Sequence, residues 1–175
     1  MERIVVIGNG GSGKSTLARQ LAAILDLPLT HLDAVYYDED WRPLPHEDFV
    51  AEQQRLTAQG RWIIEGNYAS TLPVRLAAAD TAILLDLPAI TCLWGIVQRR
   101  MRYRGGQHPR DGVYDRITWG FIRYVAGYRR SMRPRVRAAV AEHGSHARAI
   151  TLASRREADD FLNRVSSDRR GARNA

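Results

Sequence analysis

Short runs of branched apolar residues alternate along this chain with longer stretches in which apolar residues recur at helical spacing. The first run, 4–7, ends at Gly8 and predicts a buried β-strand. Four later runs predict strands at 29–32, 62–64, 81–85 and 149–152. Helices are predicted at 14–25, at 45–59, from 88 to about 101, at 117–143 and from 154 onward. Trp94 and Trp119 fall in helical patterns, so we expect them in the core.

This alternation of strands and helices predicts an α/β fold, in which helices cover both faces of a parallel sheet. In such folds the functional groups gather at the carboxyl ends of the strands. Asp33, Glu65 and Asp86 each follow a predicted strand. We therefore expect these three acids near the same edge of the sheet.

Residues 8–16 form a glycine-rich stretch between the first predicted strand and the first predicted helix, with the pattern G-x4-G-K-S. Glycines allow backbone N–H groups to approach phosphate oxygens, and the following helix N-terminus attracts the anion. Lys14 would reach the terminal phosphates, and the Ser15 hydroxyl would ligate Mg²⁺. A plain glycine turn does not require Lys-Ser-Thr in these places. The predicted nucleotide-binding residues are Gly8, Gly10, Gly11, Ser12, Gly13, Lys14, Ser15 and Thr16.

The length of 175 residues suits one domain, which we place at 1–165, with a basic, disordered tail at 166–175. No apolar run approaches the roughly 18 residues that a membrane span needs. Cys92 is the only cysteine, so no intramolecular disulfide can form. These observations favour a cytoplasmic protein with no membrane partner, either a monomer or a homodimer.

The formal net charge is +7, which makes polyanions such as nucleotides or nucleic acid plausible partners. Lys14 is the single lysine among 26 basic residues, and the other 25 are arginines. The compact ammonium therefore occurs only in the glycine-rich stretch, where a point charge among phosphates is needed.

With these motifs in place, the chain resembles the adenylate-kinase-like branch of P-loop proteins over nearly its whole length. Residues 61–68 resemble the strand and loop that read Leu-Asp-Gly-Phe-Pro-Arg in adenylate kinases. Leu85-Asp86-Leu87-Pro88 with Arg99-Arg100 resembles the strand, helix and opening of the lid, and 154–162 resembles the closing helix.

More closely, His31-Leu32-Asp33, Trp62–Tyr68 and Arg102–Gly105 resemble the bacterial DNA topology modulation proteins. The resemblance implies a three-layer P-loop NTPase fold with strand order 2-3-1-4-5, a small helical Arg-rich lid at about 99–130, and ATP binding. Two positions depart from the adenylate-kinase pattern. Ala69 replaces the arginine that reads the acceptor phosphate, and Gly95 replaces the first arginine of the lid helix.

Three acids compete for the roles that phosphoryl transfer requires. We assign Glu65, together with Ser15, to Mg²⁺, partly through water. We assign Asp33 to the acceptor, as a catalytic base. Asp86 has the local pattern of a metal-binding acid, whereas the adenylate-kinase comparison gives it a structural role. The alternative for each acid is a turn or cap residue that bonds nearby backbone. The predicted substrate-side residues are Asp33, Tyr36, Tyr37 and Asn67.

Twelve arginines lie between Gln98 and Arg137, against two acids. Arginines near a transferring phosphoryl group offset its developing charge. We predict that Arg99 and Arg104 are catalytic along with Lys14, although a solvated basic face would give the same composition. The predicted lid and phosphate contacts are Arg99, Arg102, Arg104, Arg129 and Arg130.

These features favour an ATP-dependent phosphotransferase that uses Mg²⁺ and acts on a small-molecule acceptor, a nucleoside or nucleotide being one class considered. Two alternatives stay open. One is a nucleotide-binding regulator that contacts DNA, suggested by the net charge of +7 and the arginine-rich second half of the chain. Against it, the sequence has no recognisable DNA-reading motif, and non-specific phosphate binding would give the same charge pattern. The other is a plain NTPase that uses water as acceptor.

Overall fold

The computed structural model of this chain describes residues 1–38, 40–103, 106–108, 113–115 and 117–173. A five-stranded sheet forms its centre, in the order β2-β3-β1-β4-β7, and every pair of neighbouring strands is parallel. This arrangement confirms the predicted α/β fold and the order 2-3-1-4-5. The strands of the sheet are β1 (Arg3–Gly8), β2 (Leu29–His31), β3 (Trp62–Glu65), β4 (Thr81–Leu85) and β7 (Arg148–Leu152).

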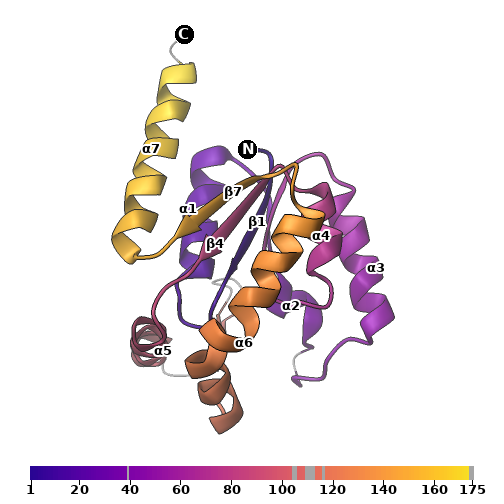
Figure 1. Ribbon diagram of the computed structural model, residues 1–175, viewed down its shortest axis with the longest axis vertical. Helices are drawn as coiled ribbons and strands as arrows, with labels where there is room; N and C mark the ends of the chain where they lie inside the picture. The colour runs from indigo at the N-terminus through magenta and orange to yellow at the C-terminus, as the bar shows by residue number, and fades with distance from the viewer. Residues whose placement is uncertain (39, 104–105, 109–112, 116, 174–175) are drawn as a thin grey trace.

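Helices cover both faces of this sheet (Figure 1). Their bounds are α1 (Lys14–Leu25), α2 (Leu32–Tyr36), α3 (His46–Thr57), α4 (Leu72–Ala78), α5 (Ala89–Tyr103), α6 (Trp119–His143) and α7 (Arg155–Arg173). A short antiparallel hairpin, β5 (Gly106–His108) and β6 (Val113–Asp115), lies between α5 and α6 in the predicted lid region. No helix in the described part of the chain has the length and apolar character to span a bilayer.

The core forms two layers because successive side chains of each strand point to opposite faces of the sheet. On β1, Ile4 and Val6 pack with α1 and α7, while Val5 and Ile7 pack with α3, α4 and α6. All four side chains are completely buried. The continuous apolar run of β1 is therefore the pattern expected for a parallel strand covered on both faces.

The register of the strands places the predicted functional residues at one edge. Val6 of β1 pairs with Glu65 of β3, and Glu65 in turn pairs with His31 of β2. On the other side, Gly8 pairs with Leu85, so Asp86 follows at the same edge. The glycine-rich stretch 8–16, which we call the phosphate loop after its predicted role, leaves β1 from the middle of this line.

The structure differs from the sequence predictions at the chain's end and at two aromatic residues. α7 continues through Arg173, where we expected a disordered tail from 166. The reason is that Val165 is buried against α1 and Arg169 donates a hydrogen bond to the Leu25 carbonyl at the end of α1. Trp94 and Trp119, expected in the core, are 56% and 75% exposed.

Candidate active site

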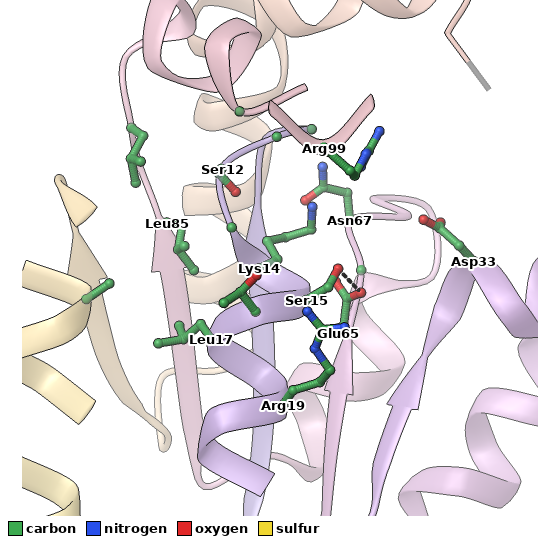
Figure 2. A pocket seen from close by; sticks show the side chains of 18 of the residues that line it. Ser12, Lys14, Ser15, Leu17, Arg19, Asp33, Glu65, Asn67, Leu85 and Arg99 are labelled. Atoms are coloured by element: carbon green, nitrogen blue, oxygen red, sulfur yellow. Dashed lines mark hydrogen bonds between the residues drawn. The ribbon is translucent and has the colours of Figure 1, made fainter. Parts of the chain in front are cut away.

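A cleft of about 1100 Å³ opens at the carboxyl edge of the sheet (Figure 2). The phosphate loop forms its floor, and Lys14 lies between the end of β3 and the loop. Side chains from α2, the segment after β3, α5, α6 and α7 complete its walls. Every predicted nucleotide-binding residue except Gly8 lines this cleft, and Gly8 is the last residue of β1 below it.

The phosphate loop takes a backbone path that requires glycine at two positions. Gly11 and Gly13 have φ angles of 75° and 95°, in the left-handed region that disfavours other residues. Gly13 is the N-cap of α1. The turn therefore presents the helix N-terminus to the cleft, where backbone N–H groups and the helix dipole suit an anion.

Two polar side chains in this loop fit a bound polyphosphate. The Lys14 ammonium donates to the Asn9 carbonyl at 3.2 Å and so stays over the loop. The Ser12 hydroxyl is buried and has no hydrogen-bond partner within the described residues. A buried donor without a partner is costly, and a phosphate oxygen would satisfy it.

Helices α5 and α6 press directly on the loop. A Cβ atom on Gly11 would lie 2.1 Å from the Cys92 carbonyl oxygen, and one on Gly95 would lie 2.2 Å from the Gly11 carbonyl oxygen. Gly95, which departs from the adenylate-kinase pattern, thus allows two backbones to touch. On the other side, the Asn9 amide donates to the Val125 carbonyl of α6 at 2.9 Å.

The two residues that we predicted to bind Mg²⁺, Ser15 and Glu65, lie in direct contact. The Ser15 hydroxyl donates to Glu65 Oε1 at 2.9 Å, and His31 Nδ1 lies 2.8 Å from the same oxygen. Burial by itself would raise the pKa of Glu65, but the His31 hydrogen bond, the Lys14 charge and Ser15 together lower that pKa below its ordinary 4.5. Sequence reasoning did not assign His31, although the register of β2 beside β3 brings it here.

This donor set fits Mg²⁺. The ion prefers oxygen ligands, keeps several waters, and is held by one or two protein groups plus substrate phosphates in nucleotide enzymes. Ser15 and Glu65 supply a hydroxyl and an ionised carboxylate beside the phosphate loop. Among the described residues, no group of three or more His, Cys, Asp or Glu side chains is arranged so that it could hold a metal ion.

The predicted acceptor residue Asp33 lies across the cleft from Glu65, in the first turn of α2 rather than at a strand end. The Tyr68 hydroxyl donates to Asp33 Oδ1 at 2.6 Å. Burial, and next the charge of Glu65, raise the pKa of Asp33 above its ordinary 3.8, although Tyr68, Lys14 and Arg99 oppose this shift. Burial also raises the pKa of Tyr68, followed by the Asp33 charge, so its phenol remains a donor.

Of the other predicted substrate-side residues, some line the cleft and one does not. Tyr37 lines the cleft, but Tyr36 does not: its ring packs against Phe49 and Tyr68, with centroids 4.8 Å apart in each pair. Asn67 lines the cleft but is already engaged. Its Oδ1 accepts the Gly8 N–H at 3.0 Å, and its Nδ2 donates to the Tyr124 hydroxyl of α6 at 2.9 Å. Asn67 therefore joins the phosphate-loop strand to α6.

Only some of the arginines that we predicted to contact phosphate lie at the cleft. Arg99 and Arg102 line the cleft from α5, whereas Arg129 and Arg130 of α6 do not. Arg104 lies outside the described residues.

Asp86 explains the position of Arg129. The Arg129 guanidinium bonds the Asp86 carboxylate at 3.2 Å and its carbonyl at 2.8 Å. Arg133 and Arg137 contact the same carboxylate at 3.4 and 3.3 Å. The Asp86 side chain, 7% exposed, thus fastens α6 to the end of β4. This geometry favours the structural role of Asp86 over the metal-binding one.

Comparison with known proteins identifies the fold. No protein-family model and no curated protein matches this sequence. Shikimate kinase from Acinetobacter baumannii, solved in complex with shikimate, is similar in structure with a TM-score of 0.56 and 17% identity, over 94% of this chain and 90% of that one.

Two further solved structures agree. A gluconokinase from Sinorhizobium meliloti 1021 has a TM-score of 0.52 and 19% identity, over 95% of this chain and 94% of that one. A sugar kinase from Janibacter sp. HTCC2649 has a TM-score of 0.51 and 20% identity, over 95% and 93%. At these identities the likeness shows the fold alone, which this chain shares with these three kinases.

Proposed function

We propose that this protein transfers the γ-phosphoryl group of ATP to a hydroxyl group of a small-molecule acceptor. One observation carries the proposal: the glycine-rich loop with Lys14 opens into a single cleft that two acids, Glu65 and Asp33, also line. The pKa of Glu65 is lowered and that of Asp33 is raised. Paired acids whose environments push their pKa values apart are typical of sites that divide charge stabilisation from proton transfer.

Glu65 and Ser15 would hold Mg²⁺, which when bound offsets the negative charge of the β- and γ-phosphates. Lys14 and the glycine-rich loop hold the phosphates, and the loop's backbone N–H groups need no reorganisation as charge develops. Arg99, which lines the wall of the cleft, would bind the transferring group. The lowered pKa of Glu65 keeps its carboxylate ionised at neutral pH.

Asp33 would accept the proton of the acceptor hydroxyl as that oxygen bonds to the γ-phosphorus and the bond to ADP breaks. A carboxylate with a raised pKa is a better base than an ordinary one, because general-base efficiency rises as the pKa approaches the working pH. The Tyr68 hydroxyl orients this carboxylate through the bond to Oδ1. The three proteins with similar structures are a shikimate kinase, a gluconokinase and a sugar kinase, which supports a hydroxylated acceptor.

The test is ADP release from Mg-ATP in the presence of nucleosides, nucleotides and hydroxylated metabolites, each against a blank without acceptor. Acceptor-dependent ADP release is expected, and Asp33→Asn should lower its kcat by about 10²–10⁴-fold while ATP binding is retained. Asp40→Asn, which alters an exposed acid, is the matched control. Equal ADP release with and without every acceptor, unaffected by Asp33→Asn, would identify a plain NTPase instead.

A DNA-contacting regulator is the second candidate, supported by the resemblance to DNA topology modulation proteins and the net charge of +7. Non-specific phosphate binding alone would weaken steeply with salt. Titration of DNA binding with salt, with and without ATP, separates the cases. Binding that survives physiological salt and responds to ATP would support the regulator, and binding that does neither would leave only a basic surface.

A further inference from the structure

Arg75 of α4 is a completely buried charge that points at main chain. Its Nη1 donates to the Gly66 carbonyl at 2.8 Å, and its Nη2 donates to the carbonyls of Asn67 at 2.8 Å and Tyr68 at 3.2 Å. No ion pair within the described residues involves Arg75, and burial lowers the pKa of its guanidinium to about 9. Apolar residues of similar volume often stabilise a core more than a buried charge does. Stability alone therefore does not account for Arg75.

The three carbonyls belong to a strained turn directly after β3, which we call the acceptor turn, Gly66–Tyr68. Gly66 has a φ angle of 146°, and a Cβ atom there would lie 2.9 Å from the Leu32 Cβ. Tyr68 has a φ angle of 32°, in the left-handed region that a bulky residue avoids. Such strain persists only where the surrounding structure enforces it, and it concentrates at functional sites. The bonds from Arg75 fix the peptide orientations of this turn.

The acceptor turn reaches both halves of the cleft. At one end Asn67 binds the Gly8 N–H, below the phosphate loop, at 3.0 Å. At the other end the Tyr68 hydroxyl binds Asp33 at 2.6 Å. The distance between the phosphate loop and the acceptor carboxylate thus depends on the shape of this turn, and that shape depends on Arg75.

We propose that Arg75 is a positioning residue for phosphoryl transfer, which locks the acceptor turn so that Tyr68 holds Asp33 in register with the phosphate loop. The catalytic part of this inference rests on the proposed function; the structural part does not. No signal in the sequence pointed to this role, because we predicted no helix around Arg75, and a single arginine outside a motif is typical of a surface residue. Arg75 does not correspond to the arginine of the adenylate-kinase pattern, because that arginine lies in the loop itself, at the position of Ala69 in this chain.

Arg75→Met and Arg75→Lys test the proposal, with Leu76→Ala as the matched control. Leu76 is buried on the same helix, lies beside Gly144 at the end of α6, and makes no hydrogen bond to the acceptor turn through its apolar side chain. Arg75→Met should lower kcat of acceptor-dependent transfer by about 100-fold, the usual effect of a displacement of about 1 Å at a reacting centre. The KM for ATP should change less than about threefold, because the hydrogen bonds of Arg75 go to the acceptor turn and none goes directly to the phosphate loop. Arg75→Lys, with no planar fork, should recover only part of kcat.

Leu76→Ala should lower thermal stability and leave kcat within about twofold when assayed below its unfolding range. Equal kcat losses in Leu76→Ala and Arg75→Met would show a merely structural role and overturn the proposal. A double-mutant cycle sharpens the test: Tyr68→Phe added to Arg75→Met should cause little further loss, because both act through one contact. Fully additive losses would also overturn it.

A crystal structure of Arg75→Met, or of Arg75→Lys should the first variant not fold, decides the structural part without any activity assay. The expected result is a turn in which Tyr68 leaves the left-handed region and its hydroxyl no longer bonds Asp33. An unchanged turn with the 2.6 Å contact intact would refute the inference. If the wild type transfers phosphate to no acceptor, the proposed function fails, and this structure still decides the role of Arg75.

Discussion

Gly95→Ala is the substitution whose effect can be worked out most directly from the structure. A Cβ atom at this position of α5 would lie 2.2 Å from the Gly11 carbonyl oxygen and 3.2 Å from its carbon. Close C···O contacts in proteins are about 3.3 Å, so α5 and the phosphate loop must separate by about 1 Å, the difference between 3.3 and 2.2. Both partners are backbone, so no side chain can rotate away.

The magnitude follows from this displacement. Overpacking a tight contact costs about 1–3 kcal/mol of stability. The displaced atoms belong to the loop that we propose binds phosphate, and each 1.4 kcal/mol lost from binding weakens the affinity by about tenfold. We therefore expect Gly95→Ala to weaken Mg-ATP binding by about 10–100-fold and to lower Tm by several degrees.

Calorimetric titration with a non-hydrolysable ATP analogue and thermal unfolding measure both effects. Gly127→Ala is the control, because it places a methyl group on α6 where nothing lies within 4 Å. It should leave Kd unchanged and raise stability by about 0.5–1 kcal/mol through the loss of glycine's backbone freedom. A Gly95→Ala protein with wild-type Kd and Tm would refute the argument that this contact shapes the loop.

Three further substitutions test the acids. The folded-state pKa of Asp33 lies above its ordinary 3.8. Ionisation of Asp33 therefore destabilises the folded state increasingly as the pH rises from 3.8 through the folded-state pKa. Asp33→Asn should raise Tm at pH 7, with a gain that shrinks as the pH falls toward 3.8; a gain independent of pH would contradict this. Glu65→Gln should weaken activation by Mg²⁺ about 10–100-fold in a metal titration, and an unchanged titration would remove Glu65 from the metal site. Asp86→Asn should lower the free energy of unfolding by on the order of 2 kcal/mol, less than for a fully buried pair because the guanidiniums are partly exposed. Denaturant titration measures this free energy. Asp40→Asn, which alters an acid that is 71% exposed, should leave it almost unchanged.

The sequence predicted the sheet well because parallel strands buried on both faces leave long apolar runs. The structure confirms β1 and β4 within a residue of their predicted bounds. Prediction failed where a helix is short, or where a segment becomes helical only because it packs against another helix. α4 has only seven residues and was missed, and 32 was assigned to a strand although Leu32 begins α2. α7 reaches Arg173 because α1 provides a surface for it, which no local pattern reveals.

The candidate site shows the same division. The phosphate loop could be predicted because its glycines, Lys14 and Ser15 lie consecutively, and their backbone geometry is a local property. Glu65 and Asp33 could be expected near it because parallel strands end at a common edge. The contacts of Asn67, and the ion pair of Asp86 with Arg129, could not be predicted, because each joins segments that are distant in the sequence.

The sequence by itself thus determined the α/β fold and the glycine-rich loop between β1 and α1, which carries the only lysine of the chain and for which we propose phosphate binding. Only the tertiary structure decided that Asp86 binds α6, that Tyr68 faces Asp33 and that Arg75 supports the turn between them. The physical reason is one of range. Periodicity and glycine geometry act over a few neighbouring residues, whereas burial and hydrogen-bond pairing between segments arise only when the chain has packed.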